Sequence, residues 1–298
     1  MKKQFLLLLL IIFTTACSGQ TQEIPPTPIP VETEAPTAIP DTVVVELKKE
    51  PVSLPPEPQA VSFTSADGQE LQGIFYPAAM ESAPVIVLMH WYPGDQNEWT
   101  EIAFWLQNRG LQGEKNGVPW KDPTWFPDRD GDQSFNVLTF TFRNCERRCN
   151  TPEPAAWLLD AQASLKFART LEGVDPDRVI AIGASIGADG AIGGCAVVLE
   201  SDPHACLGAL SLSPGSYLGL DYQDLVTQLG ESDLPRPAWC LYDENDADSL
   251  VCTLASGEHY YQESWSDGYL HGFHLFNPIL EPNTLERLLE FLDLVLGA

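Results

Sequence analysis

The distribution of apolar residues predicts a long region of alternating strands and helices that begins near residue 61. A continuous apolar run at residues 85–89 is typical of a strand buried on both faces of a sheet. Short, mainly apolar stretches predict further strands at residues 178–182, 207–212 and 237–242. Strict alternation predicts a strand at 136–142 and a hairpin over 63–76, with Asp67-Gly68 as its turn. A last strand is predicted at 262–266.

Helical spacing of apolar residues separates these strands. It predicts helices at residues 98–109, 154–171, 186–200 and 284–296. Strands that alternate with helices predict an α/β fold, with a mostly parallel central sheet and helices on both faces. Residues 111–135 interrupt this rhythm and are predicted to be an inserted loop packed over the mouth of the site.

The first residues have the pattern of an export signal. Lys2 and Lys3 precede an apolar run from Phe5 to Phe13, which is too short to span a bilayer as a helix. The run leads to Cys17, in a context that resembles the bacterial lipobox. We therefore expect a signal peptide over residues 1–16 and a lipid on Cys17, with ordinary cleavage near Ala16 as the alternative.

Residues 17–60 have the composition of a tether. Ten prolines fall between Ser18 and Ala60, and the stretch contains no aromatic residue. Such a segment buries too little apolar surface to offset the entropy lost on ordering, so it is predicted to be disordered. The domain organisation expected is thus an exported, lipid-anchored protein with one α/β domain over residues 61–298.

The charge of the chain limits its partners. With 42 acidic and 16 basic residues, the formal net charge is -26. This charge repels nucleic acids and gives no attraction to an anionic membrane, so the lipid is the only expected contact with a bilayer. No metal or other cofactor is expected. The acidic run at 128–132 has neither the ligand spacing nor the distal glutamate of an EF-hand and is interpreted as a solvated turn.

Six further cysteines predict disulfides, because an even number in an exported protein is typical of paired thiols. Counting alone allows 15 connectivities. Proximity along the chain favours the pairs Cys145–Cys149, Cys195–Cys206 and Cys240–Cys252. A zinc site is the weaker alternative, because no pair has C-x-x-C spacing and no histidine lies near Cys145 or Cys149.

Gly183-Ala184-Ser185-Ile186-Gly187 fits the G-x-S-x-G pattern of a nucleophilic serine. The motif directly follows a predicted buried strand and opens a predicted helix, which is the context that this chemistry requires. Glycines at both ends allow a sharp turn that exposes the Ser185 hydroxyl. The N–H of Ile186 is then predicted to donate to the developing oxyanion.

A nucleophilic serine needs a base and a carboxylate that orients the base. We favour His271 as the base, because it lies in a glycine-flanked turn before the last helix, and His274 is the alternative. His204 is expected in a loop next to Pro203, and His259 at the start of the last strand. The carboxylate is expected in the acidic stretch after the 237–242 strand. Asp246 is the first choice there, while Asp243 and Asp248 remain open.

From residue 61 to 298 the chain resembles the α/β-hydrolase superfamily, particularly dienelactone-hydrolase-like esterases. The order Ser185, Asp246, His271 is the order of that family. His90-Trp91-Tyr92-Pro93-Gly94 is similar to its His-Gly-x-Pro-Gly oxyanion loop, which implies Tyr92 as the second amide donor. Trp91 replaces the usual glycine, so the Trp91 amide is the alternative. Near Arg143 a cysteine pair replaces the family's glycine-rich turn after Asp-x-Arg.

These features predict a serine hydrolase that cleaves a small or medium carboxylic ester through an acyl-enzyme. Tryptophans and a tyrosine either line an acyl pocket or pack as core: Trp91, Tyr92, Trp99, Trp120 and Trp125. The alternatives are another acyl hydrolase, such as a peptidase or a cell-wall or polyester esterase, and a non-catalytic binding lipoprotein on a hydrolase scaffold.

Overall fold

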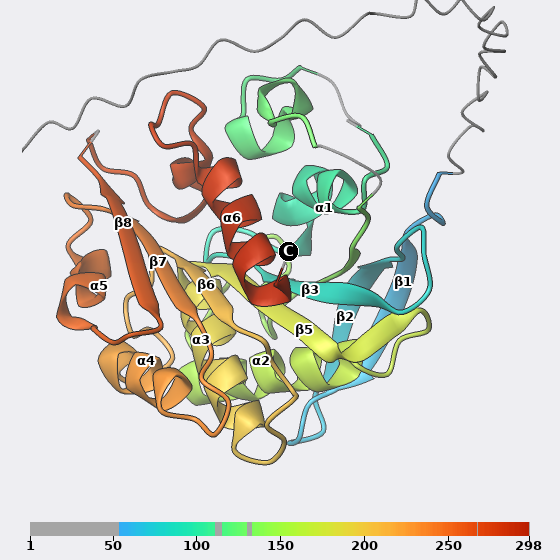
Figure 1. Ribbon diagram of the computed structural model, residues 1–298, viewed down its shortest axis with the longest axis horizontal. Coiled ribbons are helices and arrows are strands. Elements are labelled where there is room, and N and C mark those ends of the chain that lie inside the picture. Colours follow the sequence, from blue (N-terminus) through green and yellow to red (C-terminus); the bar gives the residue numbers. More distant parts are fainter. Residues whose placement is uncertain (1–53, 111–114, 130–132, 267, 298) are drawn as a thin grey trace, which may run out of the picture. The chain divides into compact units, whose positions relative to one another are not determined.

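The computed structural model describes residues 54–110, 115–129, 133–266 and 268–297 (Figure 1). All of them belong to one compact unit, Pro51–Ala298. The predicted signal peptide, Cys17 and nearly all of the predicted tether lie outside the described residues, as do residues 130–132 of the acidic run. Packing of the domain begins before residue 61, because the carbonyl of Pro56 accepts a hydrogen bond from Gln107 Nε2 at 2.8 Å.

An eight-stranded, mostly parallel sheet forms the centre of the unit, in the order β1-β2-β4-β3-β5-β6-β7-β8. β1 and β2 pair antiparallel, as do β2 and β4, and every other pair is parallel. The strands are β1 (Gln59–Thr64), β2 (Glu70–Tyr76), β3 (Ala83–Met89), β4 (Asn136–Phe140), β5 (Val174–Ala184), β6 (Ala209–Leu212), β7 (Ala238–Asp243) and β8 (Tyr260–Trp265). Each predicted strand is present.

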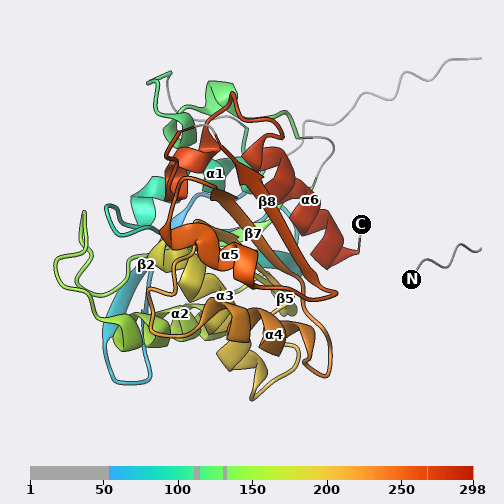
Figure 2. The same cartoon turned by 90° about the vertical axis from the view of Figure 1, so that its left-hand side faces the viewer.

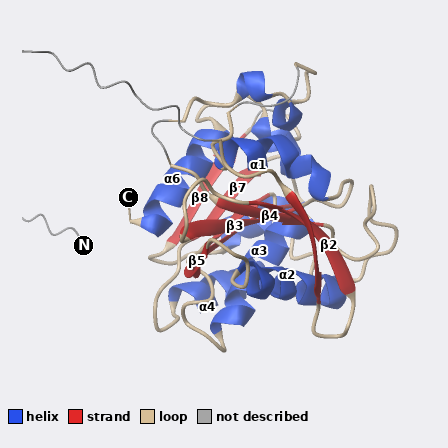
Figure 3. Cartoon of the chain, turned by 90° about the vertical axis from the view of Figure 1, so that its right-hand side faces the viewer, coloured by secondary structure: helices blue, strands red, loops and turns tan. Residues whose placement is uncertain are grey.

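Helices cover both faces of the sheet (Figure 3). α2 (Pro154–Ala168), α3 (Ile186–Leu199) and α4 (Tyr222–Gly230) lie on one side, and α1 (Thr100–Leu106) and α6 (Thr284–Leu296) on the other. The strands supply alternate residues to the two cores: Val85 and Val87 pack towards α2 and α3, whereas Ile86 and Leu88 pack towards α1 and α6. This double burial explains the continuous apolar runs in the sequence.

Three local predictions differ from the structure. The helix expected at 98–109 is a 3-10 turn (Gln96–Trp99), capped by the side chain of Asp95, followed by the shorter α1. The helix ends early because the backbone takes positive φ at Asn108 and Gly110. The insertion contains two short 3-10 helices, Pro119–Lys121 and Pro123–Trp125. Helix α4 was not predicted, although Asp221 caps it and its buried residues have helical spacing.

The structure contains the three disulfides favoured by proximity, Cys145–Cys149, Cys195–Cys206 and Cys240–Cys252. All six sulfur-bearing residues are buried. Within the described residues, no group of three or more acidic, histidine or cysteine side chains is placed to hold a metal ion. In the same part of the chain, no helix has the length and apolar character needed to cross a membrane.

Candidate active site

The candidate residues converge at the carboxyl ends of the parallel strands. Ser185 follows β5, Asp246 follows β7, and His271 follows β8, the edge strand that runs beside β7 (Figure 2). Tyr92 lies just beyond the end of β3. Because parallel strands end at one edge of the sheet, residues far apart in the sequence meet there, where open α/β sheets bind their ligands.

Ser185 sits at a sharp turn between β5 and α3. Its φ of 55° and ψ of -119° are strained for a residue with a Cβ. The turn is held by neighbouring backbone: the N–H of Ser185 donates to the carbonyl of Leu212 at the end of β6, at 2.8 Å. Strain at this position is the expected cost of presenting a side chain at the top of the sheet.

Two glycines make this turn possible. A Cβ on Gly183 would lie 1.9 Å from the carbonyl oxygen of Gly187, and a Cβ on Gly187 would lie 2.3 Å from the carbonyl oxygen of Met89. Both distances are far below contact between backbone and a methyl group, so neither position accepts alanine without moving the main chain. The glycines of G-x-S-x-G are therefore required by packing here.

A chain of hydrogen bonds joins Ser185, His271 and Asp246. Nε2 of His271 lies 2.8 Å from Oγ of Ser185, and Nδ1 lies 2.6 Å from Oδ2 of Asp246. Burial acts to raise the pKa of Asp246, but hydrogen bonds from His271 and Ser249 outweigh it and hold the pKa below its usual value. The carboxylate is thus ionised at neutral pH and is placed to orient the imidazole.

The alternative residues have other contacts. Oδ1 of Asp243 accepts hydrogen bonds from the backbone N–H and the side-chain amide of Asn245, so it stabilises its own turn. Oδ2 of Asp248 accepts the hydroxyl of Tyr217. His274 is exposed and packs its ring against Trp91 and Trp120. Neither acid bonds to His271 within the described structure.

Two backbone amides are candidates for the oxyanion hole. Ile186 is the first residue of α3, so its N–H has no partner inside the helix. Tyr92 lies in a turn in which the N–H of Gly94 donates to the carbonyl of Trp91 at 3.2 Å. Neither the Ile186 nor the Tyr92 N–H has an acceptor within the described part of the chain, as expected for amides that serve a ligand. The same holds for the N–H of Trp91, the alternative donor.

His90 fixes the peptide that carries the Tyr92 amide. Its Nε2 accepts the N–H of Phe142 at 3.1 Å, so the proton of the neutral ring is on Nδ1. Nδ1 lies 2.7 Å from the carbonyl of Trp91 and donates to it. Burial lowers the pKa of His90 to about 4, so the ring stays neutral at ordinary pH. The carbonyl and the N–H of a trans peptide point in opposite directions, so this bond also sets the Tyr92 N–H.

Several supporting residues were not predicted from the sequence. Oγ of Ser249 donates to Oδ2 of Asp246 at 2.5 Å, and Oγ of Ser213 accepts the N–H of Gly272 at 2.9 Å. The buried carboxyl of Asp189 accepts backbone N–H groups of Gly215 and Tyr217, and burial raises its pKa to about 7. These polar residues occur singly, and no spacing in the sequence marks them.

The insertion packs beside the site. Trp120 contacts Trp91 and Phe273 ring to ring, with centroids 5.7 and 5.6 Å apart. Trp91 in turn covers Gly272, where a Cβ would lie 2.8 Å from its ring. Trp99 is fully buried and packs on Phe273, so it belongs to the core. The insertion therefore supports both the loop after β3 and the segment after His271.

No family model matches the chain. The uncharacterized protein YfhR of Escherichia coli is 30% identical over 129 residues, which are 43% of this chain. The matched part spans 38% of that relative's length.

Solved structures establish the fold. The esterase Pf2001 of Pyrococcus furiosus superposes with a TM-score of 0.54 at 16% identity, over 80% of this chain and 92% of its own. The carboxylesterase EstE1, cloned from a metagenomic library, gives 0.52 at 18% identity, over 83% and 90%. The protein therefore has the α/β-hydrolase fold. The likeness at this level of identity concerns the fold, so the reaction must be argued from the site.

Proposed function

We propose that the protein is a serine hydrolase that cleaves a carboxylic ester through an acyl-enzyme intermediate. The observation that carries the proposal is the hydrogen-bond chain from Ser185 through His271 to Asp246, at 2.8 and 2.6 Å. A serine hydroxyl becomes nucleophilic only next to a positioned base, and the base needs a third group that fixes its tautomer. Three side chains suited to these roles lie together at one edge of the sheet.

The geometry of the site supports the following steps. Nε2 of His271 takes the proton of Ser185 as Oγ attacks the carbonyl carbon, and Asp246 stabilises the imidazolium that forms. The N–H groups of Ile186 and Tyr92 donate to the oxyanion of the tetrahedral intermediate. His271 then gives its proton to the leaving alcohol, and a water activated by the same base releases the acyl group from Ser185.

The substrate class proposed is a small or medium ester, as in the dienelactone-hydrolase-like esterases that the sequence resembles. The carboxylesterase identity of EstE1 supports ester cleavage by this fold. The rings of Trp91 and Trp120 beside the site are themselves buried in the core, so the proposed size of the substrate rests on the resemblance. The second candidate function is another acyl-transfer reaction by the same residues, namely cleavage of a peptide, a cell-wall ester or a polyester.

Hydrolysis of p-nitrophenyl acetate, butyrate and octanoate by the full chain tests this function. We expect p-nitrophenol release from at least the shorter esters, and the chain-length profile then gives the size of the acyl site. Absence of turnover on all three esters, together with absence of labelling by a fluorophosphonate, would favour a binding lipoprotein on a hydrolase scaffold.

Export and lipid anchoring through Cys17 are part of the proposed role. Three disulfides support an oxidising, extracytoplasmic location. In a bacterial host, the wild-type chain should fractionate with membranes, and Cys17→Ser should release esterase activity into the soluble fraction. Equal membrane association of the two proteins would contradict the anchor and leave the enzymatic proposal untouched.

A further inference from the structure

The segment after β4 meets the candidate oxyanion loop, His90 to Asp95, at three points. We call residues Phe142–Cys149 the disulfide brace, because Cys145 and Cys149 close it covalently. We propose that the disulfide brace positions the Tyr92 amide, so that the Cys145–Cys149 bond sets the strength of the oxyanion hole. This inference rests on the function proposed above and adds a positioning element to it.

The first contact fixes Tyr92 itself. The N–H of Cys149 donates to the carbonyl of Tyr92 at 3.1 Å. The preceding carbonyl, that of Trp91, is held by His90. Both peptides that flank the Cα of Tyr92 are therefore anchored, and with them the direction of its N–H.

The other two contacts hold the ends of the oxyanion loop. The N–H of Phe142 donates to Nε2 of His90 at 3.1 Å, and this bond selects the tautomer that reaches Trp91. The N–H of Arg147 donates to Oδ2 of Asp95 at 3.1 Å. Backbone groups of one short segment thus restrain the start, the centre and the end of the loop.

The disulfide brace has an unfavourable backbone conformation at two positions. Asn144 and Arg147 have φ values of 60° and 69°, and the left-handed region is unfavourable for arginine. The N–H of Cys145 donates to the carbonyl of Phe142, and that of Asn150 to the carbonyl of Asn144. With both cysteines buried, the covalent bond is what holds the Cys149 N–H against Tyr92.

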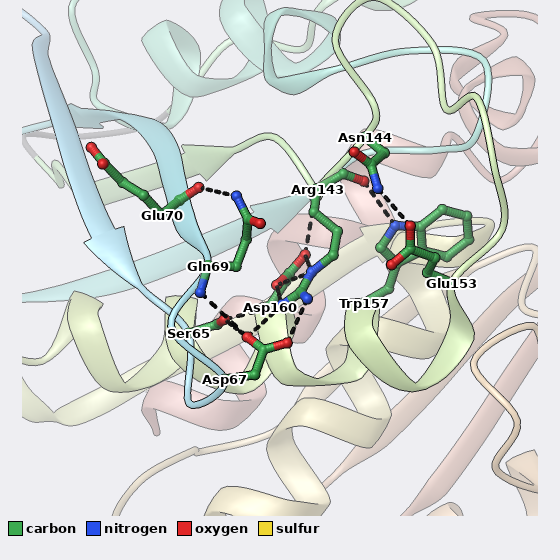
Figure 4. Close-up of polar contacts among 9 residues, drawn as sticks. All are labelled: Ser65, Asp67, Gln69, Glu70, Arg143, Asn144, Glu153, Trp157 and Asp160. Carbon is green, nitrogen blue, oxygen red and sulfur yellow. Dashed lines mark hydrogen bonds and ion pairs between the residues drawn. The ribbon is translucent and has the colours of Figure 1, made fainter.

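The base of the disulfide brace is anchored to the rest of the domain by Arg143 (Figure 4). Its guanidinium donates to Asp160 of α2 at 2.6 Å and to Asp67 of the β1–β2 turn at 2.6 Å. The hydrogen bonds that Arg143 donates to these two acids raise its pKa, so the guanidinium stays charged. Nε1 of Trp157 donates to the carbonyl of Arg143. The disulfide brace is therefore a rigid support.

If Cys145–Cys149 only stabilised the fold, its loss should affect activity no more than the loss of another disulfide. If it positions Tyr92, its loss should lower kcat more than its effect on stability explains. In the chain-entropy model a disulfide stabilises more when it closes a longer loop. Cys195–Cys206 spans 11 residues and Cys145–Cys149 spans four. Loss of Cys195–Cys206, which links the far end of α3 to the start of β6, should therefore cost more stability while leaving the oxyanion loop in place.

The test compares the double variants Cys145→Ser/Cys149→Ser and Cys195→Ser/Cys206→Ser with wild type on a p-nitrophenyl ester. We expect the first to lower kcat by about 10- to 100-fold with KM within about twofold, because small misplacements of reacting groups can cost about 100-fold. We expect the second to leave kcat within about twofold and to lower Tm more. Inhibition by a trifluoromethyl ketone, which forms an oxyanion on Ser185, should weaken only in the first.

Unchanged kcat in the first variant, or equal kcat losses in both, would overturn the positioning role while leaving the hydrolase assignment intact. An inactive wild type would instead overturn the proposed function, and the positioning role with it. Should the first variant fail to fold, Asp95→Ala is measured instead, because it removes the acceptor of the Arg147 N–H, together with the cap of the Gln96–Trp99 turn, and spares the disulfide. A kcat unchanged by Asp95→Ala would then count against the proposal.

Discussion

Ser185→Ala is expected to abolish ester hydrolysis, with kcat lowered by about 10⁴- to 10⁶-fold. The reason is chemical: without Oγ no acyl-enzyme can form, and only the oxyanion donors and substrate binding remain to accelerate attack by water. Alanine keeps the Cβ of serine and removes only Oγ, so the turn at φ 55° meets no new steric contact and the fold should survive. Rates of p-nitrophenol release and the circular dichroism spectrum measure both effects.

Ser164→Ala is the matched control for this prediction. Ser164 is buried in α2, and its hydroxyl donates to the carbonyl of Ala161 in its own helix. The same chemical change at that position should leave kcat within about twofold. Turnover retained by Ser185→Ala at more than a hundredth of the wild-type rate would remove Ser185 as the nucleophile.

Asp246→Asn is expected to lower kcat by about 10⁴-fold. The asparagine side chain keeps the size of the aspartate, but it cannot stabilise an imidazolium and can present an N–H to Nδ1 of His271. It would then hold the histidine in the tautomer that donates to Ser185 instead of accepting its proton. In the wild type the pKa of Asp246 is held below its usual value, so the carboxylate is ionised at the neutral pH of the assay.

Asp243→Asn provides the comparison for the orienting acid. Asp243 is equally buried and lies three residues away, yet its Oδ1 accepts hydrogen bonds only from Asn245. An asparagine oxygen can accept the same bonds, so kcat should change by less than about tenfold. A larger loss of kcat in Asp243→Asn than in Asp246→Asn would reverse the assignment of the two acids.

The strands and the order of the candidate residues could be predicted because one physical cause acts along the whole sequence. A parallel sheet covered on both faces favours apolar residues at successive positions, and the runs at 85–89 and 179–182 show this directly. Ser185 could be placed because its glycines are required by a turn whose context is a strand followed by a helix. Tertiary contacts were not needed for that step.

The supports of the site could not be predicted, because they depend on contacts between loops distant in the sequence. Ser249 reaches Asp246 only through the turn after β7, and Cys149 meets Tyr92 across 57 positions of the chain. Backbone N–H groups carry no residue identity, so the contacts of Phe142 and Cys149 leave no mark in the sequence. Helix α4 could have been predicted, because the sequence contains both its aspartate cap, Asp221, and the helical spacing of its buried residues.

Mass spectrometry of the protein after treatment with a fluorophosphonate tests the central claim most directly. The reagent modifies a serine only when a base activates it and an oxyanion hole holds the phosphonyl oxygen. We predict one adduct per chain, on the peptide that contains Ser185, and none in Ser185→Ala. An unmodified wild type, or an adduct on any other residue, would contradict the assignment of Ser185, His271 and Asp246 as a hydrolase triad.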